Sequence, residues 1–137
     1  MTVQPLRDDL MVQEQITGTW QHFVGVIMLN QTSRKQVKVV LPLFLSKWST
    51  AESFLSANID NVIEVIQPLG MYNRRARTLV KMSLDWLEWD GKNAKDLYGI
   101  GKYGSDSYEI FFKNNKHIDP SDKELRRYLG LPLAVKS

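Results

Sequence analysis

The sequence predicts an all-α protein, and two observations carry that prediction. Apolar residues recur at steps of three and four along nearly the whole chain, which is the spacing of one helix face. No segment combines strict apolar and polar alternation with the turn residues of a hairpin, so no strand is expected. With 137 residues, of which 43% are apolar and 24% charged, the chain is large enough to bury a core and fold as one domain.

The first two helices follow from apolar stripes at residues 20–28 and 37–45. Ser33 is a good N-cap for the second helix, because a serine hydroxyl accepts a hydrogen bond from a free amide of the first turn. Pro42 lacks an amide hydrogen, so we expect it to kink this helix or to end its first half.

Two short helices and a long one come next. A short helix is expected at residues 51–55, and Asp60 is expected to cap another at residues 62–66, which Pro68 and Gly70 stop. Asn73 then opens a longer helix. Its predicted buried stripe consists of Ala76, Leu79, Val80, Ser83, Leu84 and Leu87.

The C-terminal third contains a turn and three further helical segments. Asp90-Gly91 marks the turn, and residues 94–97 form a short helical piece. After the tight sequence Gly99-Ile100-Gly101 a helix passes through Tyr108, Ile110 and Phe111. The last helix begins near Pro120 or Ser121 and runs through Leu125 and Tyr128 to Gly130.

Composition excludes several classes of function. The chain has no cysteine, which excludes disulfides, thiolate zinc sites, iron–sulfur clusters and cysteine nucleophiles. Two histidines argue against a histidine-rich metal centre. The longest strictly apolar run, residues 23–29, is far shorter than the roughly 20 residues that cross a bilayer, so no membrane partner is expected. A formal charge of +3 permits an anionic partner without requiring one.

The segment Leu97-Tyr98-Gly99-Ile100-Gly101-Lys102-Tyr103-Gly104 is the most informative one for chemistry. Two glycines on either side of one apolar residue favour a hairpin whose backbone can approach a partner, while Ile100 anchors the turn in the core. Exposed amides in such a turn, together with the N-terminus of the next helix, can hold a phosphate without reading sequence. A helix that simply ends in glycine is the competing explanation.

In this context the chain resembles the helix-hairpin-helix DNA glycosylase superfamily, and most closely the catalytic domains of methyl-CpG-binding-domain thymine glycosylases. The resemblance extends from residues 12–14 through 28–33 and 68–72 to the hairpin and residues 120–122. It implies the two-lobed helical fold of that superfamily with a central cleft. We therefore expect a single glycosylase domain over 1–137, with a core lobe at about 18–104 and a second lobe formed by 1–17 and 105–137, and no methyl-CpG reader before it.

The resemblance also implies a catalytic carboxylate. The family carries an aspartate beyond the hairpin, followed on the same helix by an apolar residue and an arginine, and Asp122, Leu125 and Arg127 match this pattern. Breaking an N-glycosidic bond develops positive charge on the sugar, which a neighbouring carboxylate stabilises while it orients or deprotonates water. The competing interpretation makes Asp122 an ordinary helix-start residue. Asp119 and Asp106 rank second and third as catalytic candidates.

Tyr103 stands where lyase-competent members of the superfamily carry a lysine that forms a Schiff base. Because a tyrosine cannot form one, we expect a monofunctional enzyme in which Tyr103 stacks on or hydrogen-bonds the extruded base. The resemblance also puts Val12 and Gln13 in the base pocket, where a carboxamide suits the imide edge of thymine or uracil. The flipped base leaves a gap in the stack, and Gln31 and Met71 are the candidates to fill it.

Gln31 departs from the family, because the relatives carry arginine at this position, and this puts the preference for the opposite base in doubt.

Basic residues complete the predicted interface with double-stranded DNA. Lys102 follows the hairpin, and Arg74 and Arg75 follow the Met71 wedge, where they could neutralise backbone phosphates. Two basic groups are distinguished along the chain: Arg34, Lys35 and Lys38, and then Arg74, Arg75, Arg77 and Lys81.

We therefore expect a monofunctional DNA N-glycosylase that hydrolyses the bond to a flipped thymine- or uracil-type base, with G·T or G·U mismatches as substrates. No cofactor is expected, and only the resemblance implies a monovalent cation at the hairpin. The protein should be a monomer located in the cytoplasm or nucleoid of a bacterium or virus-infected cell, or in a nucleus. Two alternatives stay open: a non-catalytic helix-hairpin-helix DNA-binding module, and a phage-type enzyme that modifies 5-substituted thymine bases in DNA.

Overall fold

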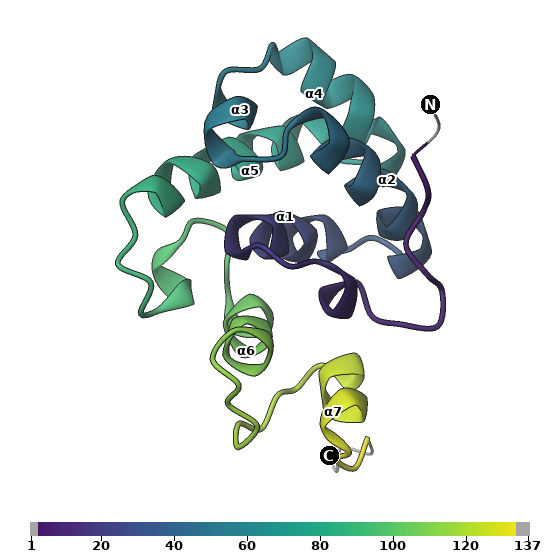
Figure 1. Cartoon of the computed structure of the whole chain (residues 1–137), viewed down its shortest axis with the longest axis vertical. Coiled ribbons are helices and arrows are strands. Elements are labelled where there is room, and N and C mark those ends of the chain that lie inside the picture. Colours follow the sequence, from purple (N-terminus) through teal and green to yellow (C-terminus); the bar gives the residue numbers. More distant parts are fainter. Residues whose placement is uncertain (1–2, 134–137) are drawn as a thin grey trace.

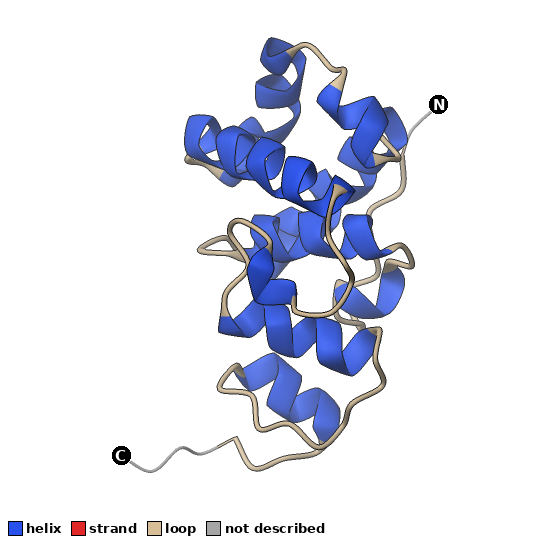
Figure 2. Cartoon of the chain, turned by 90° about the vertical axis from the view of Figure 1, so that its left-hand side faces the viewer, coloured by secondary structure: helices blue, strands red, loops and turns tan. Residues whose placement is uncertain are grey.

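In the computed structural model of the protein, residues 3–133 are described and contain helices but no strand, as the sequence predicts (Figures 1 and 2). The α-helices are α1 (Thr19–Leu29), α2 (Arg34–Lys47), α3 (Ala51–Leu55), α4 (Ile59–Ile66), α5 (Tyr72–Leu87), α6 (Lys102–Phe111) and α7 (Lys123–Leu129). Three 3₁₀ turns complete the list: η1 (Gln13–Gln15), η2 (Gln67–Leu69) and η3 (Ala94–Asp96). None of these helices is both long and apolar enough to span a membrane.

Helix α1 lies at the centre of the fold and packs against α2, α5 and α6, while α3 and α4 pack against α5 (Figure 1). Phe23, Val24 and Met28 of α1 have no exposed surface. Trp20 is also buried, and its indole Nε1 donates a hydrogen bond of 2.9 Å to the hydroxyl of Ser83 in α5. This bond satisfies both buried polar groups, so the tryptophan serves packing, as expected.

Pro42 does not end its helix, because α2 continues from Arg34 to Lys47. A proline removes the amide that would bond the carbonyl four residues earlier, here that of Lys38. The amide of Leu6 donates to this carbonyl instead, at 2.9 Å, and the Lys38 ammonium donates to the carbonyl of Asp8 at 3.0 Å. The N-terminal segment is therefore attached to α2 where the proline leaves an acceptor free. The predicted division into two lobes stays a prediction.

Several helix boundaries differ from the sequence prediction. Asn58, rather than Asp60, caps α4, and its side chain accepts the Asp60 amide at 2.8 Å. Helix α5 begins at Tyr72, one residue before the predicted start.

The predicted buried stripe of α5 is correct at Ala76, Leu79 and Ser83, which are buried. It is wrong at Leu84 and Leu87, which are 53% and 44% exposed. The buried face of α5 runs through Arg75, Ala76, Leu79, Met82 and Ser83, and Leu84 and Leu87 lie away from it.

In Figure 1, α6 and α7 lie below the group formed by α1 to α5. Helix α7 follows a long connection from α6 and buries Leu125 completely, and Phe111 of α6 meets Tyr128 of α7 with ring centroids 4.7 Å apart. Asp122 and Tyr103 are thus brought to one side of the molecule by two different helix starts.

Candidate active site and nucleic-acid interface

A cavity of about 530 Å³ lies between the start of α7, the start of α6, η1 and the loop from α1 to α2. It contains most of the residues predicted to act on a base. The residues that line it are Met11, Gln13, Leu29, Asn30, Gln31, Thr32, Ser33, Arg34, Tyr103, Asp122 and Glu124. Sequence reasoning found four of them as site residues, Gln13, Gln31, Tyr103 and Asp122, although they are far apart in the chain.

Asp122 is half-buried at the edge of this cavity and is also the N-cap of α7. Its Oδ2 accepts a hydrogen bond of 3.0 Å from the amide of Leu125. No hydrogen bond to Oδ1 is found within residues 3–133. The helix-start role and a role in the cavity are therefore compatible, because capping uses one carboxylate oxygen and leaves the other available.

Tyr103 and Gln13 form the inner part of the cavity wall. The Nε2 amide of Gln13, which is only 5% exposed, donates a hydrogen bond of 2.6 Å to the phenol oxygen of Tyr103. Burial raises the pKa of Tyr103 to about 12, and the nearby Asp122 carboxylate adds to the rise. The phenol therefore stays neutral at physiological pH. Since its oxygen already accepts from Gln13, its own O–H can donate to another group.

Val12 does not line the cavity. Its side chain is 2% exposed and belongs to the hydrophobic core, and a Cβ added at Gly25 of α1 would lie 3.5 Å from it. Met11 and Gln13, the residues on either side of Val12 in the chain, lie on the wall instead. This corrects the predicted position of the Val12 side chain. The cause is the 3₁₀ turn η1, which directs neighbouring residues to different sides.

The glycine hairpin has the form that the sequence predicts. Ile100 is 5% exposed and anchors the turn, whereas Gly99 and Gly101 lie at the surface. Gly99 has φ +82°, and a Cβ there would lie 2.7 Å from the Thr78 side chain, so only glycine fits. Nothing lies within 4 Å of a Cβ at Gly101, the N-cap of α6. The first amides of α6 have no partner inside the helix and can bind an anion.

Lys102, the first residue of α6, is exposed beside the hairpin. Its ammonium is 2.7 Å from the carboxylate of Asp106 and 3.4 Å from the carbonyl of Asp119. Asp119 also pairs with Arg126. Neither Asp106 nor Asp119 lines the 530 Å³ cavity, which agrees with ranking them below Asp122.

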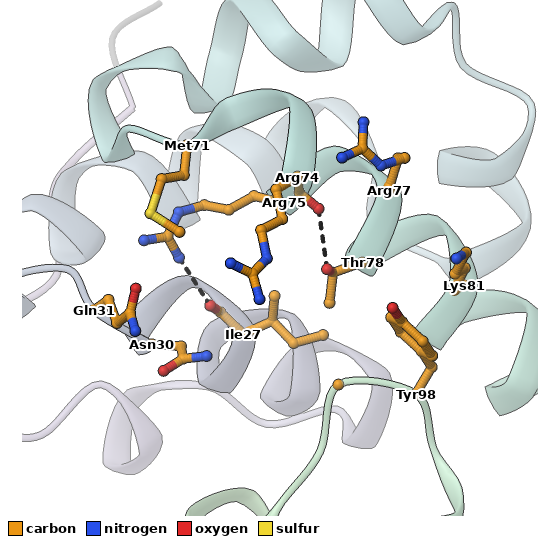
Figure 3. Close-up of a pocket in the computed structure, with 11 residues that line it drawn as sticks. Ile27, Asn30, Gln31, Met71, Arg74, Arg75, Arg77, Thr78, Lys81 and Tyr98 are labelled. Carbon is orange, nitrogen blue, oxygen red and sulfur yellow. Dashed lines mark hydrogen bonds between the residues drawn. The ribbon is translucent and has the colours of Figure 1, made fainter.

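A second cavity, of about 330 Å³, lies between α1, α5 and the hairpin (Figure 3). Its lining contains no carboxylate, and Figure 3 shows the Arg74 side chain directed into it from α5. The ammonium of Lys81 lies 4.9 Å from the ring centre of Tyr98. No salt bridge of Arg74, Arg77 or Lys81 is found in the described part of the chain. The residues that line this basic cavity are Ile27, Asn30, Gln31, Met71, Arg74, Arg75, Arg77, Thr78, Lys81, Tyr98 and Gly99.

Arg75 differs from its exposed neighbour Arg74, because it is only 5% exposed. Its guanidinium donates to the carbonyls of Ile27, Met28 and Gly70 and to the hydroxyl of Thr32. These bonds connect the end of α1 to the start of α5. Since most N–H donors of the guanidinium are occupied by these acceptors, Arg75 holds the cavity wall together in this structure, and its predicted phosphate contact stays a prediction.

Two members of the first basic group, Arg34 and Lys38, are occupied by contacts within the protein. Lys38 is buried against the N-terminal segment and Arg34 pairs with Glu124 at 3.2 Å, whereas Lys35 is exposed.

Gln31 and Met71, the two predicted wedges, lie at one end of the basic cavity and approach from opposite walls (Figure 3). Both have a left-handed backbone, with φ of 61° and 47°, which residues other than glycine rarely adopt. Met71 is 46% exposed although it is apolar. Gln31 also lines the 530 Å³ cavity, as does its neighbour Asn30, so these two residues are shared by both cavities. Backbone strain of this kind concentrates at functional sites and supports a role in binding.

The helical fold and the glycine hairpin beside a cavity that holds a carboxylate define a helix-hairpin-helix protein. Comparison with known families gives the same class. Residues 24–130 match the family described as HhH-GPD superfamily base excision DNA repair protein, and the chain belongs to this superfamily.

Known proteins similar to this chain include one from a plant and one from an archaeon. A methyl-CpG-binding domain protein 4-like protein of Arabidopsis thaliana is 26% identical over 121 residues, which cover 88% of this chain and 27% of that protein. The thymine-DNA glycosylase of Aeropyrum pernix is 28% identical over 126 residues, 86% of this chain and 56% of the relative. The chain therefore spans about half of the archaeal relative and about a quarter of the plant one.

Two solved structures share the fold. A thermostable thymine-DNA glycosylase superposes with a TM-score of 0.71 at 20% identity, over 80% of this chain and 53% of that one. A non-covalent endonuclease III–DNA complex superposes with a TM-score of 0.65 at 16% identity, over 78% and 53% of the two chains. At these identities the likeness establishes the helical fold alone.

Proposed function

We propose that the protein is a monofunctional DNA glycosylase that hydrolyses the N-glycosidic bond of a flipped thymine- or uracil-type base, with G·T or G·U mismatches as substrates. One observation carries the proposal: the carboxylate of Asp122 and the neutral phenol of Tyr103 line the same cavity, and no lysine lies among its lining residues. A carboxylate without a neighbouring amine suits hydrolysis by water and leaves an abasic site.

The 530 Å³ cavity receives the flipped base in this proposal, and extrusion of the base is easiest from a mispair. The Gln13 amide nitrogen already donates to Tyr103, so the Gln13 oxygen is free to accept and the Tyr103 hydroxyl is free to donate. Thymine and uracil offer an N3–H donor between two carbonyl acceptors. One acceptor and one donor on the wall therefore complement adjacent groups of that imide edge.

The free Oδ1 of Asp122 serves the sugar. As the bond between C1′ and the base nitrogen breaks, the electron pair leaves with the base and positive charge develops on the deoxyribose. The negative charge of Asp122 stabilises this state, and the carboxylate orients the water whose oxygen forms the new bond to C1′. The water proton passes to the carboxylate, and the departing base is protonated by solvent.

Duplex binding is assigned to the basic cavity and the hairpin. Amides of Gly101 and Lys102 bind one phosphate, while Arg74, Arg77 and Lys81 neutralise its neighbours along the strand. Gln31 and Met71 enter the space that the flipped nucleotide leaves. Side chains at strained positions suit this role because their direction is fixed before DNA arrives.

The remaining parts of the proposal concern the cation, the assembly and the location. A monovalent cation at the hairpin would rest on backbone carbonyls of residues 97–101, since oxygen atoms are the ligands of hard cations. The protein acts as a monomer on double-stranded DNA. Because its substrate is DNA, the protein is located in a nucleoid or the surrounding cytoplasm, or in a nucleus.

The test is base release from defined duplexes. Purified protein is incubated with labelled duplexes that contain G·T, G·U, A·T, A·U or 5-hydroxymethyluracil, and free base is measured by chromatography. We expect free thymine or uracil from the mismatches, with strand cleavage only after alkali and no covalent trapping by borohydride. Trapping would overturn the monofunctional assignment.

If no free base is released from any duplex, the proposal that the protein is a glycosylase is overturned. Salt-sensitive binding without release would then indicate a DNA-binding module, and a base altered at its 5-substituent with an intact glycosidic bond would indicate a modifying enzyme.

A further inference from the structure

The ion pair between Arg34 and Glu124 joins two walls of the 530 Å³ cavity. Arg34 is the first residue of α2, and Glu124 is the second residue of α7. The guanidinium Nη1 of Arg34 lies 3.2 Å from Oε2 of Glu124, and the same carboxylate oxygen accepts from Arg127 at 2.6 Å. Arg34 and Glu124 line the cavity together with Asp122.

These charges face the same space. Burial is the main cause of the raised pKa of Tyr103, the negative charges of Asp122 and Glu124 add to it, and the positive charge of Arg34 opposes it. All three charged groups are therefore close enough to act on one phenol. The cavity therefore contains two alternative ion-pair partners for the guanidinium of Arg34, the carboxylates of Glu124 and Asp122.

Which carboxylate pairs with Arg34 affects a reaction that develops positive charge on the sugar. A guanidinium bound to Asp122 would cancel the charge that stabilises the sugar cation, and it would occupy the carboxylate oxygen that faces the substrate. In the structure Glu124 accepts a hydrogen bond from Arg127 and forms an ion pair with Arg34, whereas no hydrogen bond to Oδ1 of Asp122 is found in residues 3–133.

We infer that Glu124 is a positioning residue for the proposed reaction: its ion pair with Arg34 holds that guanidinium away from Asp122, so that Oδ1 of Asp122 stays without an ion-pair partner. This inference rests on the proposed function. Glu124 does not touch the substrate in this role, and its effect is exerted through Arg34. Neutralisation of Glu124 alone should therefore lower the excision rate. Neutralisation of Arg34 in addition should restore the excision rate.

The first experiment is a double-variant cycle with Glu124→Gln, Arg34→Gln and the combination of both. Single-turnover excision rates are measured at saturating protein on a G·T duplex, and duplex affinity is measured separately. We expect Glu124→Gln to slow excision about tenfold with affinity within about twofold, and the double variant to recover to within about threefold of the parent rate. A double variant as slow as Glu124→Gln would overturn the inference.

Glu109→Gln is the matched control. Glu109 of α6 pairs at 3.7 Å with Lys113, which follows the end of that helix, and does not line the cavity, so its neutralisation should leave the excision rate unchanged. Thermal unfolding of all variants shows whether α7 is still folded. A merely structural role for Glu124 would add a second loss in the double variant, whereas the inference requires a gain.

The second experiment does not depend on activity. In a crystal structure of the free Glu124→Gln variant, we expect the Arg34 guanidinium within hydrogen-bond distance of Oδ1 of Asp122. An Arg34 that stays beside residue 124 or turns to solvent would overturn the inference. If the parent protein releases no base, the proposed function fails, but this structure still decides whether Glu124 holds Arg34 away from Asp122.

Discussion

The side-chain amide of Gln13 donates a hydrogen bond of 2.6 Å to the phenol oxygen of Tyr103, 90 positions further along the chain. This bond joins the 3₁₀ turn η1 to the start of α6 and fixes the orientation of both groups on the cavity wall. It also decides which of their atoms remain free for a ligand. The Gln13 oxygen is left as an acceptor and the Tyr103 hydroxyl as a donor.

Tyr103→Phe should therefore affect both stability and base release. Loss of the acceptor leaves a buried amide nitrogen of Gln13 without its partner, so the free energy of unfolding should fall by about 1–2 kcal/mol. Release of thymine should slow while duplex affinity changes little. Urea unfolding and single-turnover kinetics check this. Tyr98→Phe, which alters a 48% exposed tyrosine, is the stability control and should change unfolding by less than about 0.5 kcal/mol.

Asp122→Asn should separate the two roles of this residue. Asparagine is as good an N-cap as aspartate, so the stability of α7 should be kept, whereas the loss of charge should slow excision by about a thousandfold. Asp122→Ala should in addition lose about 1 kcal/mol of stability, because the Leu125 amide loses its acceptor. Asp119→Asn lies outside the cavity and should excise at the parent rate. Equal rates for Asp122→Asn and Asp119→Asn would exclude Asp122 as the catalytic carboxylate.

Arg74 and Arg75 should give opposite results although they are adjacent. Arg74→Ala should weaken duplex binding and lower the slope of log affinity against log salt by about one, with little change in unfolding. Arg75→Lys should lower the free energy of unfolding by about 2–3 kcal/mol, because one ammonium cannot replace a planar guanidinium bonded to several acceptors. Salt titrations and urea unfolding measure the two effects. The assignments would be reversed if Arg74→Ala unfolded more easily and Arg75→Lys lost salt-dependent affinity.

The two hairpin glycines should likewise differ. Gly99→Ala puts a Cβ 2.7 Å from Thr78 at a φ of +82° and should destabilise the fold by about 1–2 kcal/mol. Gly101→Ala meets no atom within 4 Å and should leave the unfolding free energy nearly unchanged, yet its methyl group stands where a phosphate would approach and should weaken duplex binding. Unfolding and binding measured on both variants test the pair. Parent-like affinity for Gly101→Ala would argue against phosphate binding at the hairpin.

His22 should make stability depend on pH. Burial lowers its pKa to about 4, and its Nε2 lies 2.8 Å from the hydroxyl of Ser107. Between this value and the ordinary value near 6.5, the unfolded chain binds the proton and the folded protein does not. Stability from this group is therefore complete above about pH 6.5 and falls by about 3 kcal/mol as the pH is lowered to about 4.

Urea unfolding between pH 7.5 and 4.5 measures this slope. His22→Gln should remove the contribution of this histidine to the pH dependence of the unfolding free energy. His117→Gln, which changes an exposed histidine, should leave that dependence unchanged. An unchanged slope in His22→Gln would show that other groups cause the pH dependence.

Local signals in the sequence predicted much of the fold and of the site. Apolar spacing located the helices, Ser33 capped α2 as expected, and Ile100 anchored the glycine hairpin. These features depend on residues within a few positions of one another, so the sequence contains them. The resemblance to a family brought Asp122, Tyr103 and Gln13 together, and the cavity that they line supports that grouping.

Other structural features depend on contacts between groups that are far apart in the chain. The periodicity of the sequence does not predict such contacts. Arg74 and Arg75 look alike in a basic run, but a rotation of one residue along α5 turns one toward solvent and the other toward the free carbonyls at the end of α1. Leu84 and Leu87 are apolar but lie outside the face of α5 that packing buries.

The sequence by itself therefore determined an all-α chain with a glycine hairpin, because helix periodicity, capping and backbone freedom are local properties. The resemblance to a family added the carboxylate of Asp122, which caps the last helix. Only the tertiary structure decided that the carbonyl left free by Pro42 bonds Leu6, that Val12 enters the core, and that Arg34 meets Glu124 across the cavity. The physical reason is that buried polar groups and charges must find partners, and those partners come from whichever segments the packed helices bring together.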